Sequence, residues 1–92
     1  MHTIHLLITG KVQGVFYRAS AKDVADRLGL KGWIRNTKEG DVEAVVTGEQ
    51  NEVMLFARWC RQGPPRADVE DVIVTEKPEE GFADFVVERG KK

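Results

Sequence analysis

Apolar and polar residues alternate through residues 3–9, and a period of two is typical of a β-strand that is buried on one side. Ile4, Leu6 and Ile8 form the apolar face of this segment. The pattern therefore predicts that the chain begins with a strand whose aliphatic face lies against a hydrophobic core.

Two later segments repeat apolar residues at the spacing of an amphipathic helix. In residues 19–28 the apolar positions are Ala21, Val24, Ala25 and Leu28, and in residues 51–62 they are Val53, Phe56, Ala57 and Cys60. Gly29 follows the first segment, where a left-handed residue ends many helices, and Gly63-Pro64-Pro65 follows the second, where proline prevents continuation. The sequence therefore predicts two helices.

The remaining apolar segments predict four more strands. They are residues 31–36, 42–47, 68–76 and 82–89. The polar turn 37–41 is short enough to join the first two in a hairpin. The element order is then βαββαβ plus a terminal strand. It predicts the α+β class and a ferredoxin-like α/β sandwich, in which an antiparallel sheet carries both helices on one face.

Length and composition fit one globular domain. The chain has 92 residues, of which 41% are hydrophobic and 32% charged, so we expect a single domain spanning residues 1–92. The formal net charge of −1 gives no long-range attraction to nucleic acid or to an anionic membrane. No segment is apolar enough to span a bilayer, no signal peptide is recognisable, and the single cysteine excludes an internal disulfide. We therefore expect a cytoplasmic protein that binds neither nucleic acid nor membrane. We also expect a monomer, because no long apolar stripe is left over once the core is assigned.

The connection between the first strand and the first helix has the composition of an anion site. It reads Gly10-Lys11-Val12-Gln13-Gly14-Val15-Phe16-Tyr17-Arg18. Its glycines let the backbone approach a ligand closely, its amides lie at a helix N-terminus, and Arg18 adds a forked cation. The connection therefore supplies converging N–H donors for a phosphate-like oxyanion.

A second cluster follows in the predicted hairpin, and the two together identify a family. It comprises Gly32-Trp33-Ile34-Arg35-Asn36, with Gly40, Val42 and Gly48 beyond it. The pair resembles the acylphosphatase family, whose first signature is glycine, any residue, valine, glutamine, glycine, valine, any residue, aromatic, arginine. Gly10 to Arg18 fill that signature completely. The second is filled except at Ile34, where the family usually carries a smaller residue, and we expect this difference to affect strand packing only.

The resemblance covers nearly the whole chain and implies an activity. Acylphosphatases hydrolyse a carboxyl–phosphate anhydride to carboxylate and orthophosphate. The resemblance implies that Arg18 and Asn36 are the catalytic residues, with Arg18 binding the phosphoryl group and Asn36 positioning the attacking water. The backbone N–H groups implied to bind the phosphoryl group belong to Gln13, Gly14, Val15, Phe16, Tyr17 and Arg18. We also expect the side chain of Gln13 to brace the loop.

The implied chemistry agrees with these residue types. The leaving carboxylate has a conjugate acid with a pKa of about 4, so it departs without a general acid. Phosphoryl transfer depends mainly on positioning and on neutralising the phosphoryl oxygens, which a bidentate arginine and fixed amides achieve. The partner is then a small acyl phosphate, with inorganic phosphate or sulfate as further ligands of the site. We expect no metal and no cofactor.

Other interpretations of the same residues stay open at this point. A non-catalytic ferredoxin-like module that binds an anion or a partner protein is the main alternative, and a nucleic-acid-binding module of this fold is the weakest. Domains of this kind also begin larger proteins that handle carbamoyl phosphate. We expect His2 and His5 to be surface or sheet-face residues, and Cys60 to be a buried core residue rather than a nucleophile.

Overall fold

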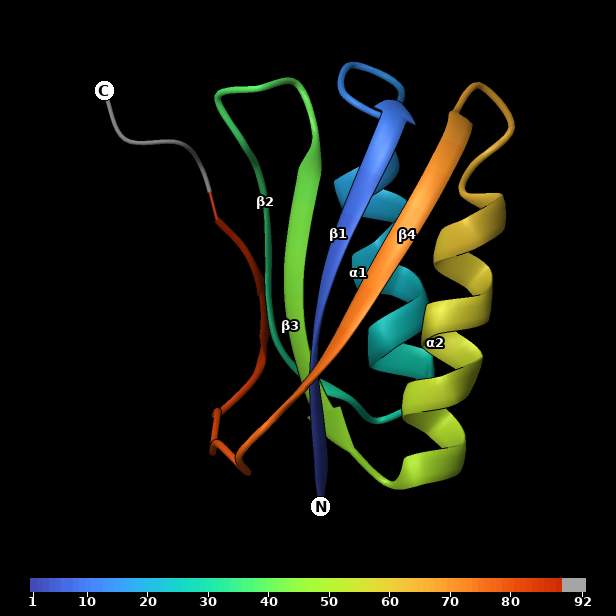
Figure 1. Cartoon of the computed structure of the whole chain (residues 1–92). Helices are drawn as coiled ribbons and strands as arrows, with labels where there is room; N and C mark the ends of the chain where they lie inside the picture. Colours follow the sequence, from blue (N-terminus) through green and yellow to red (C-terminus); the bar gives the residue numbers. More distant parts are fainter. Residues whose placement is uncertain (89–92) are drawn as a thin grey trace.

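The chain forms one five-stranded sheet with two helices packed on one of its faces (Figure 1). The computed structural model describes residues 1–88. The strands are β1 (His2–Lys11), β2 (Lys31–Asn36), β3 (Val42–Gly48), β4 (Asp68–Lys77) and β5 (Phe85–Val87), and the helices are α1 (Tyr17–Arg27) and α2 (Gln50–Gln62). The predicted element order and the ferredoxin-like sandwich are confirmed. The end of the predicted last strand, Arg89, lies outside the described residues.

The prediction of a wholly antiparallel sheet is wrong at one edge. The strand order is β4-β1-β3-β2-β5, and β5 runs parallel to β2 whereas the other neighbours are antiparallel. After β4 the chain reverses, but it crosses to the opposite edge of the sheet instead of pairing beside β4 (Figure 1). Since β2 is antiparallel to β4, a strand that reverses from β4 and reaches β2 must run parallel to it. The sheet is therefore mixed.

Both helices differ from the prediction by one or two residues at their ends, and α1 ends at Arg27, one residue before the predicted end, with Leu28 as its C-cap. α1 begins at Tyr17, two residues before the predicted start, because Phe16 takes a left-handed conformation and serves as its N-cap. At its other end the Leu30 N–H donates to the Ala25 carbonyl at 2.9 Å and the Gly29 N–H to that of Asp26 at 3.1 Å. These two bonds form the glycine-based helix ending that the sequence predicts. α2 begins one residue early and ends at Gln62, with Gly63 as its C-cap, as predicted.

The core lies between the sheet and the two helices. The alternating face of β1 is buried as predicted, with Leu6 and Ile8 fully enclosed. Phe56 and Cys60 of α2 face the same core. Burial raises the pKa of the Cys60 thiol to about 12, so this cysteine stays protonated and acts as a small apolar residue. The prediction of a structural role for Cys60 is confirmed.

The other face of the sheet is open and carries a short polar network. His5 Nε2 lies 2.7 Å from a carboxylate oxygen of Glu43, and Arg35 Nε donates to the other oxygen at 3.1 Å. The Arg35 guanidinium also lies 4.6 Å from the centre of the Trp33 ring. The contacts with His5 and Arg35 lower the pKa of the Glu43 carboxyl, with the hydrogen bond to His5 as the largest cause. His5 is therefore a sheet-face residue, as predicted.

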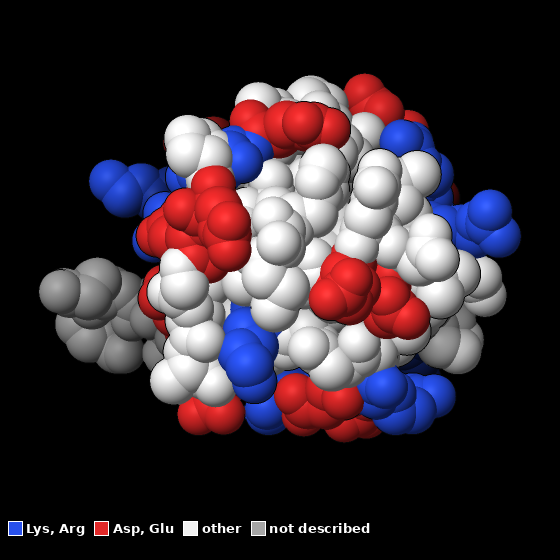
Figure 2. Space-filling model, turned by 90° about the horizontal axis from the view of Figure 1, so that it is seen from below, with Lys and Arg blue, Asp and Glu red and all other residues white. Residues whose placement is uncertain are grey.

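The surface charges are mixed in sign. Figure 2 looks at the end of the molecule opposite the β1–α1 loop, where basic and acidic side chains are interspersed around a largely uncharged centre. This agrees with the formal net charge of −1. Within residues 1–88 no helix is both long and apolar enough to cross a membrane. An anion site in this protein must therefore arise from local geometry rather than from an overall positive field.

Candidate active site

The loop between β1 and α1 is fixed to the core by alternate side chains. Val12, Val15 and Tyr17 are buried, with 1%, 5% and 1% of their surface exposed, while Gly14 and Phe16 point to solvent. The buried side chains hold the loop in one conformation because each fills a place in the core. The exposed backbone between them is left free to meet a ligand.

The backbone conformation of this loop leaves its donors unused. Gly14 has φ +75° and Phe16 has φ +65°, so left-handed residues stand on both sides of Val15. No N–H group of residues 13–18 donates a hydrogen bond to another residue in the described part of the chain. Loops with left-handed residues commonly turn successive N–H groups into one concavity, and such a concavity binds anions. The loop therefore offers the set of donors that the sequence implied.

The N-terminus of α1 adds to this site. The first N–H that bonds back into the helix is that of Ser20, which donates to the Phe16 carbonyl at 3.0 Å. No side chain caps this end, and its first turn contains no acidic residue. The positive end of the helix dipole is therefore unneutralised and directed at the loop.

Tyr17 anchors the start of α1 to α2. Its hydroxyl donates to the Cys60 carbonyl at 2.7 Å, and its ring lies 5.3 Å from that of Trp59. Burial raises the pKa of Tyr17 well above its ordinary value, so the hydroxyl remains a donor. The side chain of Tyr17 is thus structural, while its backbone N–H donates to no other residue in 1–88.

Gln13 ties the loop to the turn that follows Asn36. Its side-chain Nε2 donates to the Thr37 carbonyl at 2.9 Å and to the Asp41 carbonyl at 2.8 Å. The turn is closed by further bonds, from the Thr37 N–H to the Asp41 carbonyl at 2.9 Å and from the Asp41 N–H to the Thr37 hydroxyl at 3.1 Å. The predicted bracing role of Gln13 is confirmed, and the brace fixes two segments of the site relative to each other.

Asn36 is the last residue of β2 and lies beside the loop. It pairs with Val42 of β3, which fixes its backbone. The Oδ1 atom of Asn36 is buried but has no hydrogen-bond partner in residues 1–88. Because a buried acceptor without a partner is costly, this atom is suited to accept a hydrogen bond from a water molecule or ligand in the cleft.

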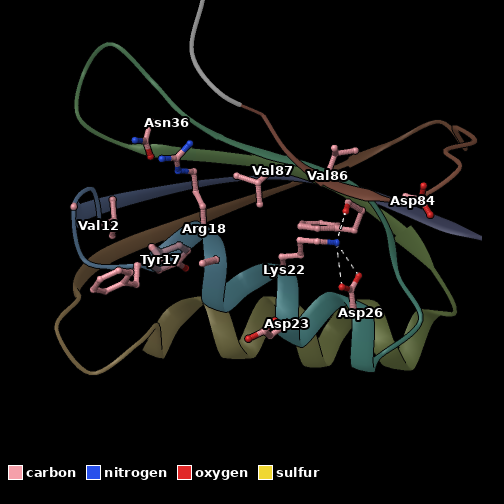
Figure 3. Close-up of a pocket in the computed structure, with 14 residues that line it drawn as sticks. Val12, Tyr17, Arg18, Lys22, Asp23, Asp26, Asn36, Asp84, Val86 and Val87 are labelled. Carbon is pink, nitrogen blue, oxygen red and sulfur yellow. Dashed lines mark hydrogen bonds and ion pairs between the residues drawn. The ribbon is translucent and has the colours of Figure 1, made fainter.

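Arg18 extends from the first turn of α1 toward Asn36 (Figure 3). One of its terminal nitrogens donates to the Glu88 carbonyl at 3.2 Å. The guanidinium forms no ion pair within residues 1–88. It is therefore held by a neutral carbonyl that leaves its positive charge uncompensated by those residues.

These groups line one open cleft between α1 and β5 (Figure 3). The cleft has a volume of about 1030 Å³, and Gly14, Phe16, Tyr17, Arg18 and Asn36 all border it. The side chains of Gln13 and Val15 do not line it, since one binds the turn and the other enters the core. The structure thus brings together the two residues implied to be catalytic and most of the loop.

The residues at the other end of this cleft were not predicted from the sequence. Lys22, Asp23, Asp26 and Asp84 line it, together with β5. A signal was present in the sequence, because Lys22 and Asp26 follow Arg18 at intervals of four residues and so share its helix face. No three His, Cys, Asp or Glu side chains are grouped as a metal site would require in the part of the chain that the structure describes.

Comparison with known proteins identifies the family. The acylphosphatase family model matches residues 4–87. An acylphosphatase of Trichormus variabilis is 48% identical over 86 residues, covering 94% of this chain and 85% of that protein. An acylphosphatase of Methylococcus capsulatus is 47% identical over 90 residues, which cover 97% of this chain and 98% of that protein. The solved structure of an acylphosphatase from Coxiella burnetii matches with a TM-score of 0.91 and 42% identity, over 95% of this chain and 92% of that one. This chain therefore belongs to the acylphosphatase family.

Proposed function

We propose that this protein hydrolyses acyl phosphates in the cleft between α1 and β5, with Arg18 and Asn36 as the catalytic residues. Arg18 and the backbone amides of residues 13–18 hold the phosphoryl group, and Asn36 positions a water molecule for in-line attack on phosphorus. The single observation that carries the proposal is the convergence of unused donors, an arginine and an unpartnered amide oxygen on one cleft. Family membership supports the reaction class.

The amides and the guanidinium match the charge that the reaction develops. The phosphoryl group carries its negative charge on oxygens, and donors fixed before the reaction stabilise that charge without reorganising. The loop is held by buried side chains, and Arg18 is held by the Glu88 carbonyl, so both are in place before substrate binds. Loss of one such donor typically slows a reaction about 100-fold to 1,000-fold.

Asn36 is suited to orient water but not to remove its proton. Its carboxamide accepts and donates hydrogen bonds and is not a base at neutral pH. In the proposed step the water oxygen forms a bond to phosphorus, the bond from phosphorus to the carboxyl oxygen breaks, and the carboxylate leaves with that electron pair. A non-bridging phosphate oxygen takes the proton from water. No general acid is needed because the conjugate acid of the leaving group has a pKa of about 4.

The test is hydrolysis of benzoyl phosphate in the presence of a chelator. We expect rapid turnover by the parent and a fall of about 100-fold or more in kcat/KM for both Arg18→Ala and Asn36→Ala. Arg66→Ala and Asn51→Ala are matched controls, because both residues are exposed and neither lines the cleft. Circular dichroism establishes that each variant is folded.

Two outcomes would contradict the proposal. A rate within tenfold of the parent for either cleft variant would remove that residue from the catalytic role. A folded parent that hydrolyses benzoyl phosphate no faster than buffer, yet binds inorganic phosphate in an NMR titration, would establish the non-catalytic anion-binding module instead.

A further inference from the structure

The strand β5 is held on one edge by the sheet and on the other by side chains of α1. It is three residues long and stands last in the strand order, so β2 is its one neighbour in the sheet among the strands of residues 1–88. At the ends of this pairing, the Gly32 N–H donates to the Asp84 carbonyl at 2.9 Å, and the Glu88 N–H donates to the Ile34 carbonyl at 2.8 Å. A strand this short gains little from one ladder, so contacts with α1 matter for its position.

Two residues of α1 make those contacts. Lys22 Nζ donates to the Phe85 carbonyl at 3.0 Å, and the Arg18 guanidinium donates to the Glu88 carbonyl at 3.2 Å. The two donors are four residues apart and so stand one turn apart on the same face of the helix. Both ends of β5 are therefore bonded to one face of α1, and one of the two bonds belongs to the arginine of the cleft.

Lys22 is itself held in place from the other side. Its ammonium donates to the carboxylate of Asp26 at 3.1 Å and 3.5 Å, as well as to Phe85. These contacts hold the ammonium group between the Asp26 carboxylate and the Phe85 carbonyl. Lys22 borders the cleft (Figure 3), yet its hydrogen bonds are directed to protein groups.

We propose that Lys22 is a positioning residue for Arg18. By bonding Phe85 it fixes β5 against α1, so that the Glu88 carbonyl stands where it holds the Arg18 guanidinium toward Asn36. The inference rests on the proposed function, since it concerns the orientation of the arginine that is proposed to bind the phosphoryl group. The side chain of Phe85 is 2% exposed and its ring lies 5.8 Å from that of Phe56, so β5 stays attached when the Lys22 bond is lost. Substitution of Lys22 should therefore displace the Glu88 carbonyl without detaching β5 or unfolding the domain.

The expected effect on catalysis follows from how sensitive the rate of an active site is to misplaced groups. A misplacement of about 1 Å by a change outside the reacting groups can cost about 100-fold in rate. We expect Lys22→Met to lower kcat/KM for benzoyl phosphate by about 10-fold to 100-fold. Lys22→Arg keeps a cationic donor and should recover activity to within about threefold of the parent.

Three further variants separate this role from simpler ones. Lys31→Met controls for the loss of charge, because the Lys31 side chain forms no hydrogen bond or ion pair with another residue in 1–88. Asp26→Asn weakens the ion pair between Lys22 and Asp26 but leaves the bond from Lys22 to Phe85. If Lys22→Met acted only by destabilising α1, Asp26→Asn should lower kcat/KM by a similar factor. Arg18→Ala/Lys22→Met tests the coupling, because Lys22 should matter less than twofold once Arg18 is absent.

A readout that needs no catalysis completes the experiment. The heteronuclear ¹H–¹⁵N NOE of the Arg18 Nε–H reports the order of the guanidinium, and we expect it to fall in Lys22→Met but not in Lys31→Met. Unchanged Arg18 order, or a Lys22→Met effect that persists in the Arg18→Ala background, would overturn the inference. If the parent does not hydrolyse benzoyl phosphate, the proposed function fails, and the NOE still decides whether Lys22 orders Arg18.

Discussion

Replacing Gln13 tests whether the brace between the loop and the hairpin turn matters for the site. Gln13→Met keeps a side chain of similar length but removes the Nε2 group that donates to the Thr37 and Asp41 carbonyls at 2.9 Å and 2.8 Å. Each such bond contributes about 0.5–1.5 kcal/mol net, so losing both should lower the free energy of unfolding by about 1–3 kcal/mol. For a domain of this length, a loss of about 2 kcal/mol lowers Tm by about 8–16 °C.

The catalytic effect should appear in kcat more than in KM. The turn held by Gln13 begins directly after Asn36, so its release loosens the residue proposed to position water. The loop amides and Arg18, which are proposed to bind the phosphoryl group, keep the anchoring of Val15 and Tyr17. We expect kcat for benzoyl phosphate to fall about tenfold while KM changes less than threefold.

A charged variant makes the same test dependent on pH. In Gln13→Glu a carboxylate faces two carbonyl oxygens, so at pH 7 this variant should be less stable than Gln13→Met. Protonation restores one O–H donor, and the difference from the parent should narrow as the pH falls to 5. Thermal unfolding by circular dichroism and steady-state kinetics on benzoyl phosphate measure both effects. A Gln13→Met variant with Tm within about 2 °C and kcat within twofold of the parent would refute the reasoning.

Three further predictions concern residues outside the cleft. The contacts of Glu43 lower the pKa of its carboxyl below the ordinary 4.5, so its ionised form stabilises the fold above that pH and the contribution is lost as the pH falls through the lowered pKa. The difference in urea-unfolding free energy between parent and Glu43→Gln should therefore shrink as the pH falls below 4.5, and a difference that is unchanged down to about pH 3 would contradict this. Cys60 should react with iodoacetamide at pH 8 at least about 100-fold more slowly in the native protein than in urea, because it is buried and its pKa is about 12; equal rates would contradict its burial. Gly32→Ala should cost more than about 3 kcal/mol, since φ is +139° and a Cβ would overlap the Val45 carbonyl. Gly81→Ala, where a Cβ meets nothing within 4 Å, is its control and should change stability by less than about 0.5 kcal/mol.

Local patterns predicted most of the fold because each element has its own amphipathic period. The β1 face, the helix ending at Gly29 and the stop at Gly63 all depend on residues close together in the chain. The parallel pairing of β5 was not predictable in this way. It depends on which sheet edge the chain reaches after β4, and that edge is set by the arrangement of the other strands and not by the period of the segment itself.

The candidate site divides along the same line. The loop donors lie on one continuous segment, so its composition predicted an anion site, whereas Asn36 was singled out only through the resemblance to a family. The start of α1 was missed because left-handed backbone is usually supplied by glycine, and here Phe16 adopts it. The bond between Lys22 and Phe85 joins residues 63 positions apart, and such a contact follows only from the folded arrangement.

The loop between β1 and α1 has a specific sequence signature, although any residue except proline can supply a backbone N–H donor. The geometry of the loop explains why particular residues are needed. Side chains in the loop mostly face away from the proposed ligand. Val12, Val15 and Tyr17 enter the core, and Gln13 binds the adjacent turn. Gly14 supplies a left-handed conformation at little steric cost. The residue type at each of these positions therefore fixes the backbone conformation, and the backbone in turn directs its N–H groups at the ligand. A substitution in this loop should accordingly act on the rate through geometry, so that conservative changes in packing disturb catalysis as much as changes in charge do.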